Sequence, residues 1–340
     1  MNIAYLIGNG FDLNLGLKTK YMDFYKYYLE QESKNDIIRK FKQDLSDSLE
    51  NWSDLEVVLG EYTTKFQEGK EQEFIDLLDD IQDNLADYLA SQKIDFELID
   101  NMRTKIINDI FAPSQYLNPR ERQRYDNFMK GFLAQNYTTN LITFNYTQSI
   151  ENILNYQEGH PVSSSREYNS NKYSLIIKKI RHIHGTIDNN MILGVNDISQ
   201  IANQNFRKTS ELLNHFIKPQ MNIDAGTLRD EWSKNQINSA DLICIYGMSL
   251  GETDKVWWQL INRRLINSGA VLIIFVVKEE IPSRRDYIAQ TYKEKIIEKL
   301  LSYSSLTNEV KAKVKERIFV SINSEMFNIK QLIIGDKKSA

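Results

Sequence analysis

The sequence predicts an α/β protein with a doubly wound, mostly parallel sheet and a large all-helical insertion. Short, near-continuous apolar runs alternate with helical patterns near the start of the chain and again after residue 135. Between them lies a charged segment with three- and four-residue apolar spacing and almost no strand signal. The 340 residues exceed the roughly 250–300 at which one core stops growing, which indicates one elaborated core or two lobes.

The first predicted unit, residues 1–30, is a strand, a glycine turn and a helix of a nucleotide-binding core. The apolar run at residues 3–7 leads directly into Gly8 and Gly10, as a buried strand entering a tight turn does. Thr19 is expected to cap the following helix. Four aromatic residues then recur at helical spacing: Tyr21, Phe24, Tyr25 and Tyr28.

Residues 31–134 are predicted to form the helical insertion, and residues 135–340 the remainder of the core. An apolar stripe between residues 74 and 89 has acidic residues on its other faces, which we interpret as a solvated surface. Residues 162–171 are rich in Ser and Asn and are predicted to be a loop. Five further strands are expected at residues 141–144, 175–183, 242–246, 271–277 and 318–322.

Composition excludes several classes of protein. Lys and Arg number 42 against 46 for Asp and Glu, a net charge of −4 that gives no electrostatic reason to bind nucleic acid. The single Cys244 excludes an internal disulfide framework and a zinc ribbon. The first residues lack a signal-peptide pattern, and the longest apolar run, at residues 270–277, is too short for a membrane helix. We therefore expect a cytoplasmic protein without a membrane partner.

Ligands of such sheets bind outside the carboxyl ends of the strands, so residues that follow strands are the candidate site. The turn at residues 8–12 could present backbone amides to a phosphate, although its spacing departs from the G-x-G-x-x-G fingerprint and a plain tight turn is the alternative. Asn145, in the segment that begins at Thr143, could hold a ribose hydroxyl or a water, or serve as a turn residue or helix cap.

Two later strand ends complete the candidate set. His182 and His184 share a face if their strand continues, and Gly185 leaves room beside the second ring. A metal pair would need a third ligand, and no Asp or Glu lies nearby at ligand spacing, so a single catalytic histidine without a metal is favoured. At residues 246–254, backbone amides and Ser249 could cradle a phosphate or ribose, and Asp254 could accept from sugar hydroxyls or cap a helix.

Four segments in this order resemble the AbiH family of bacterial abortive-infection proteins: IGNGFD at residues 7–12, TFNYT at 143–147, HIHG at 182–185 and YGMSLGETD at 246–254. That family is in turn distantly similar to the sirtuin-like fold, a Rossmann-type domain that binds NAD. Thr147 stands where sirtuin deacylases usually have an aspartate, and their zinc-binding cysteines have no counterpart here. Protein deacylation is therefore not expected.

The resemblance implies a role for each matching residue. Asn145 matches the catalytic-loop asparagine and His184 the histidine of the HG pair, so we predict that Asn145 positions a water or ribose and that His184 is the general base. Asp254 or Glu56 would hold sugar hydroxyls. The nucleotide is predicted to contact Gly8, Asn9, Gly10, Asp12, Thr143, Gly185, Gly247, Ser249 and Asp254.

The leading hypothesis is an antiphage effector that hydrolyses the nicotinamide–ribose bond of NAD, its substrate, when infection is sensed. Its partners would be this nucleotide and a phage-derived trigger or partner protein, with residues 31–134 as a gate; a homo-oligomer is compatible with the resemblance. The rival hypothesis is a non-enzymatic nucleotide-binding switch or phage sensor. Nucleotide binding without turnover distinguishes the rival from the hydrolase.

Overall fold

The computed structural model describes residues 1–49, 52, 54–92, 99–278 and 286–328. Within them lies one sheet with the strand order β3-β4-β2-β1-β5-β6-β7, in which β3 alone runs antiparallel to its neighbour. The prediction of an α/β protein with a mostly parallel sheet is confirmed. The strands are β1 (Asn2–Ile7), β2 (Tyr137–Thr143), β3 (Val162–Tyr168), β4 (Asn171–His182), β5 (Leu242–Tyr246), β6 (Val271–Val276) and β7 (Ile318–Ile322).

The loop predicted at residues 162–171 is wrong, because Val162–Tyr168 forms β3 at the edge of the sheet. Most β3 side chains face solvent, so the strand has no apolar pattern by which to recognise it. Its partner is β4, through a two-residue turn in which Asn169 and Ser170 have left-handed φ angles of 48° and 61°. Such a turn matches the twist of paired strands, which explains why Asn and Ser occupy it.

Helices cover both faces of the sheet. Within the described residues no helix is both long and apolar enough to cross a membrane. The helices are α1 (Gly10–Asn14), α2 (Tyr21–Glu30), α3 (Asp36–Asp47), α4 (Leu55–Tyr62), α5 (Glu71–Ser91), α6 (Ile99–Phe111), α7 (Pro119–Met129), α8 (Ser149–Leu154), α9 (Ser210–Phe216), α10 (Lys218–Asp224), α11 (Arg229–Ser239), α12 (Lys255–Asn267), α13 (Asp286–Ser302) and α14 (Asn308–Lys315).

Side chains of β1 alternate between two cores, as the period of a strand requires. Tyr5 and its neighbours on one face pack in a cluster with Ile106 and other residues of α6. Leu6 faces the opposite cluster, which contains Trp258 and Ile261 of α12. A strand buried on both faces reads as a continuous apolar run, and this is why residues 3–7 are recognisable in the sequence.

Helices of the predicted insertion pack in two different places. Buried side chains of α3, α4 and α5 form a third core with residues 193–216, which follow β4, and with α2, which was predicted as part of the first unit and not of the insertion. We call α2 to α5 together with residues 193–216 the helical lobe. By contrast, α6 and the following α7 pack on the face of the sheet that bears Tyr5. The lobe therefore combines segments from before β2 and after β4.

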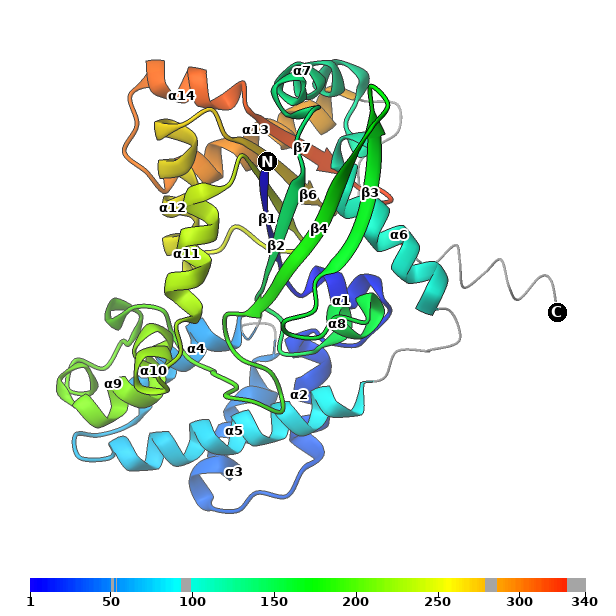
Figure 1. The fold of residues 1–340 in the computed structure, drawn as a ribbon. Coiled ribbons are helices and arrows are strands. Elements are labelled where there is room, and N and C mark those ends of the chain that lie inside the picture. Colours follow the sequence, from blue (N-terminus) through cyan, green and yellow to red (C-terminus); the bar gives the residue numbers. More distant parts are fainter. Residues whose placement is uncertain (50–51, 53, 93–98, 279–285, 329–340) are drawn as a thin grey trace.

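The helical lobe lies at the carboxyl ends of the strands, where β1, β2 and β4 point toward α2, α4 and α5 (Figure 1). The chain builds β1, β2 and β4 outward in one direction and then returns to place β5 on the other side of β1. The order of the strands thus reverses between β1 and β5. Open α/β sheets bind ligands outside the carboxyl ends at such a reversal.

Candidate functional site

At the reversal point, the loop that follows β1 is in direct contact with the loop that follows β5. The amide of Gly8 donates to the carbonyl of Tyr246 at 3.0 Å, and the amide of Gly10 donates to the carbonyl of Gly247 at 2.8 Å. A Cβ on Gly10 would lie 2.4 Å from the Cα of Gly247, whose own φ is +68°. Glycine is therefore required here so that two backbones can touch. Both amides already have acceptors, so neither is free for a phosphate in this arrangement.

Gly10→Ala is expected to destabilise the fold by about 1–3 kcal/mol, because the new methyl group meets backbone that cannot rotate away. Chemical denaturation measures the change. Gly131→Ala is the matched control, since a Cβ at Gly131 meets no atom within 4 Å. Equal stability of the two variants would contradict the contact between Gly10 and Gly247.

Aromatic rings fill the remaining space beside this contact. The ring of Phe327 lies 5.6 Å from that of Phe11 and 4.7 Å from that of Tyr246, with edge-to-face geometry in both pairs. All three side chains belong to the core on the α6 face. The crevice between β1 and β5 therefore holds protein side chains on this face.

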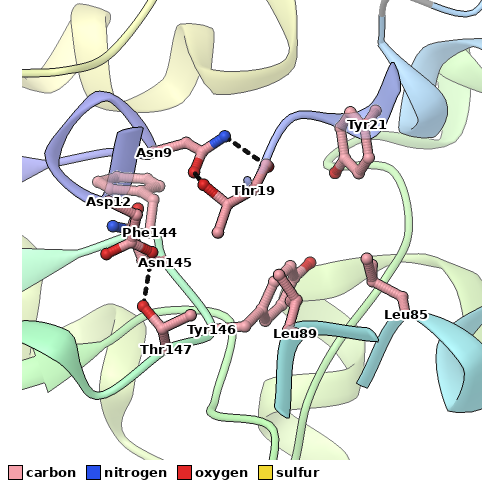
Figure 2. A pocket seen from close by; sticks show the side chains of 10 residues that line it. All are labelled: Asn9, Asp12, Thr19, Tyr21, Leu85, Leu89, Phe144, Asn145, Tyr146 and Thr147. Carbon is pink, nitrogen blue, oxygen red and sulfur yellow. Dashed lines mark hydrogen bonds between the residues drawn. The ribbon is translucent and has the colours of Figure 1, made fainter. Parts of the chain in front are cut away.

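A cavity of about 110 Å³ lies beside the carboxyl ends of β1 and β2. Figure 2 shows Asp12, Asn145 and Thr147 grouped on one side, with Tyr21 and the α5 residues Leu85 and Leu89 across from them. Polar groups thus meet an apolar wall from the helical lobe, the composition typical of a small-molecule site. The lining residues are Asn9, Asp12, Thr19, Tyr21, Leu85, Leu89, Phe144, Asn145, Tyr146 and Thr147.

Asp12 is a buried carboxylate with one oxygen unused. Its side chain is in the first turn of α1 and is 1% exposed. Thr147 Oγ1 donates to Oδ2 at 2.5 Å, whereas Oδ1 has no hydrogen-bond partner. Burial raises the pKa of Asp12 to about 6, although the hydrogen bond from Thr147, the polar side chains of Ser149 and Asn145 and the charge of His182 oppose the rise. A carboxyl group with a pKa near neutrality is suited to proton transfer.

Asn145 presents a second buried acceptor. The residue is 7% exposed, and its side-chain Oδ1 has no hydrogen-bond partner. Its backbone is held from both sides: the amide donates to Thr143 Oγ1 at 3.2 Å, and the carbonyl accepts from His182 Nδ1 at 2.7 Å. A buried polar atom without a partner costs free energy, so the unused oxygens of Asp12 and Asn145 indicate a ligand that donates hydrogen bonds.

His182 and His184 would share a face only if their strand continued to His184. It does not, because β4 ends at His182. His182 uses both ring nitrogens, one on Asn145 and the other on Glu151 Oε1 at 2.6 Å. Among the described residues, no three His, Cys, Asp or Glu side chains are grouped as a metal site would need.

His184 lies outside the 110 Å³ cavity. Its ring packs 5.6 Å from the ring of Phe144 and lines a second cavity of about 30 Å³ with Lys218 and Trp257. Burial, followed by the charge of Lys218, lowers the pKa of His184 well below its usual value. Its predicted role as general base toward a ligand in the larger cavity would require contact across the ring of Phe144. The role remains a prediction.

A buried ion pair joins the helical lobe to the second cavity. Lys218 on α10 donates to Glu56 on α4, and the two residues are 2% and 8% exposed. Burial raises the pKa of Glu56 to about 7 despite the favourable charge of Lys218. Burial raises the pKa of Asp254 to about 6, and the charge of the same ammonium opposes this rise. Glu56 and Asp254 are absent from the lining of either cavity.

The other predicted ligand residues lie in different settings. Ser249 is exposed and lines neither cavity. Gly185 has a φ of +74°, and a Cβ there would lie 1.8 Å from the carbonyl oxygen of Asn190, so a tight turn explains this glycine. Asn9 lines the larger cavity and accepts from Thr19 Oγ1 at 2.5 Å. Thr19 therefore does not cap α2, whose N-cap residue is Lys20.

The sequence profile of the family described as bacteriophage abortive infection AbiH matches residues 4–276. The chain belongs to the AbiH family. The matched region contains the residues of the larger cavity and both histidines of the HIHG segment. Its description associates the AbiH family with abortive infection, a defence against bacteriophage. No curated protein matches the sequence.

Proposed function

We propose that this AbiH protein acts in phage defence by binding NAD in the 110 Å³ cavity and hydrolysing the bond between nicotinamide and ribose. The observation behind the proposal is the pair of buried oxygens without partners, Asp12 Oδ1 and Asn145 Oδ1, beside the cavity. Both are acceptors and both lack donors. The hydroxyl groups of a ribose supply donors of this kind.

The charge of the lining favours the nicotinamide end of the dinucleotide. Among the residues that the structure describes, no Lys or Arg lines the larger cavity, and Asp12 is its one carboxylate. The aromatic rings of Tyr21, Phe144 and Tyr146 also line the cavity. A carboxylate and aromatic faces attract a cation, and the nicotinamide ring of oxidised NAD carries a positive charge. A phosphate would be repelled and would remain outside.

The size of the cavity is compatible with binding of only one part of a dinucleotide. Ligand clefts commonly measure roughly 300–1,000 Å³, so about 110 Å³ admits one ring-sized part of a dinucleotide. Three residues of the wall, Tyr21, Leu85 and Leu89, come from α2 and α5 of the helical lobe. Movement of these helices would change how much of a dinucleotide the cavity admits, which supports a gate that opens when phage infection is sensed.

The strand order adds independent support for a dinucleotide. Numbered in chain order, the six parallel strands β1, β2, β4, β5, β6 and β7 lie in the order 3-2-1-4-5-6. This is the order of the Rossmann-type sheet, to which the sirtuin-like fold is related. The cavity lies at the carboxyl edge of that sheet, beside the first strand.

The proposed reaction begins with a water molecule held by Asn145. The water oxygen attacks C1′ of the nicotinamide ribose and its proton passes to Asp12, while the C1′–N bond breaks and its electron pair goes to the departing nicotinamide. Positive charge moves from the ring to the ribose in the transition state, where the Asp12 carboxylate stabilises it. The products are nicotinamide, ADP-ribose and a proton. Asp12 takes the role of base because, unlike His184, it lines the cavity.

Mass spectrometry of NAD incubated with the purified protein tests the proposal, with and without lysate from phage-infected cells. We expect nicotinamide and ADP-ribose to appear, and Asn145→Ala to slow their release by about 10²-fold or more. Asn127→Ala is the control, because Asn127 is exposed on α7. If turnover is lost in His184→Gln but not in Asp12→Asn, His184 and not Asp12 is the general base.

A nucleotide-binding switch is the second candidate function, and the part that α2 and α5 play in the wall of the cavity favours it. A site built partly from the helical lobe would couple ligand binding to movement of the lobe without any reaction. This function predicts saturable NAD binding with no product under either condition.

A further inference from the structure

We propose that His182 and Glu151 form a largely buried positioning pair that fixes the backbone of Asn145 and so directs its side chain to the cavity. The pair lies behind the 143–147 loop, and neither residue lines the cavity. For its effect on turnover the inference rests on the proposed function. Its effect on the geometry of Asn145 can be measured without any reaction.

The partners of His182 determine its protonation. Nδ1 lies 2.7 Å from the carbonyl oxygen of Asn145, and Nε2 lies 2.6 Å from Oε1 of Glu151. A backbone carbonyl and a carboxylate can only accept, so both ring nitrogens must donate. His182, 8% exposed, is therefore an imidazolium paired with Glu151.

The charges around His182 support this state. Burial lowers the pKa of His182, but the hydrogen bond and charge of Glu151 on α8, with the carbonyl of Asn145, raise it above its usual value. Arg229 on α11 opposes the rise. Asp12 on α1 is also within electrostatic reach, since the charge of His182 lowers the pKa of Asp12.

The loop is held at successive points, which is what a preorganised site requires. The amide of Asn145 is bound by Thr143 at the end of β2, and its carbonyl by His182 at the end of β4. Two residues later, Thr147 donates to Asp12. Asn145 is therefore fixed between two adjacent strand ends, and the contact from β4 depends on Glu151.

The free-energy cost of burying an incompletely hydrogen-bonded ion pair indicates that the pair does more than fill space. Glu151 Oε2 is buried without a hydrogen-bond partner, so the pair is incompletely satisfied. Hydrocarbon side chains of similar volume often stabilise a fold as well as a buried ion pair does. A pair that directs a neighbouring residue has a reason to retain its charge.

The test compares wild type with His182→Leu, which cannot donate to Asn145, and with Glu151→Gln. Nuclear magnetic resonance of the Asn145 side-chain amide, identified by its absence in Asn145→Ala, reports geometry. We expect this signal to shift in His182→Leu and not in His160→Leu, where an exposed histidine is replaced. An unmoved Asn145 signal in folded His182→Leu would overturn the inference, whether or not NAD is hydrolysed.

The pH profile of turnover separates positioning from simple packing. In wild type, deprotonation of His182 sets the Nε2 lone pair against the Glu151 carboxylate, so turnover should fall at alkaline pH. Gln at position 151 can donate to neutral His182, so Glu151→Gln should remove this alkaline loss. His182→Leu should lower kcat at least tenfold at neutral pH. If wild type is active, an unchanged kcat in His182→Leu would refute the positioning role, and so would an alkaline fall in Glu151→Gln equal to that of wild type. If wild type is inactive, only the proposed hydrolase is refuted.

Discussion

Asp12→Asn is expected to lower NAD turnover by about 10³-fold or more while making the folded protein more stable at neutral pH. The amide cannot accept a proton and carries no charge to stabilise the ribose in the transition state. It can still accept from Thr147, so the local structure should persist. Product release by mass spectrometry and thermal unfolding of the same sample measure the two effects.

The gain in stability has a definite pH dependence. Burial raises the pKa of Asp12 in the folded state to about 6, above the unfolded value of about 3.9. Stability is therefore greatest below the unfolded pKa and is lost as pH rises through the folded pKa. Asparagine does not ionise, so the variant should match wild type near pH 4 and exceed it above pH 6 by roughly 1–3 kcal/mol.

Asp126→Asn is the matched control, because it removes the same charge from an exposed position on α7. It should change neither turnover nor the pH dependence of stability. A stability difference between Asp12→Asn and wild type that stays constant from pH 4 to 8 would show that Asp12 is not a strained buried carboxylate. Full turnover in Asp12→Asn would remove it from the reaction.

The fold could largely be predicted from apolar runs, because strands buried on both faces leave a continuous signal. Residues 242–246 and 318–322 coincide with β5 and β7. The prediction failed where that signal is absent. β3 is an exposed edge strand, and the polar first half of β2, residues 137–140, precedes the apolar run that was recognised.

The candidate site could be predicted in part, since Asp12 and Asn145 both follow strands that pair in parallel. Their convergence follows from sheet topology. The opposite wall of the cavity could not be predicted, because nothing in the amphipathic pattern of α5 says that Leu85 and Leu89 face a ligand site rather than a core. The partnership of His182 with Glu151 had a usable signal: Glu151 follows β2, the neighbour of β4.

Glycine patterns gave the least secure inference. Gly8 and Gly10 suggested a phosphate loop, yet their amides bond to the loop that contains Gly247. A glycine in a sequence reports that something approaches the backbone closely, without saying whether that is a ligand or another backbone. These two interpretations can be distinguished only from the pairing of β1 with β5, which brings the two glycine loops together.

Lys218→Met is expected to destabilise the protein by about 3–5 kcal/mol, the largest stability effect among these variants. The substitution leaves Glu56 buried with its counter-charge removed. The double variant Glu56→Gln/Lys218→Met should recover most of the loss, because a neutral amide replaces the unpaired charge. Chemical denaturation of the single and double variants at fixed pH measures the coupling.

The sign of the pH dependence distinguishes an unpaired charge from a packing defect. Burial already raises the pKa of Glu56 to about 7, so its protonated form is favoured in the folded state. Without Lys218 that preference grows, and the stability lost as pH rises through the folded pKa becomes larger and extends to higher pH. Lys218→Met should therefore be far less damaging at pH 5 than at pH 8, whereas a packing defect would cost the same at both. The exposed Lys172→Met controls for charge. Because Glu56 is on α4 and Lys218 on α10, a pH-dependent loss would also identify this pair as a structural link between α4 and the segment that follows β4.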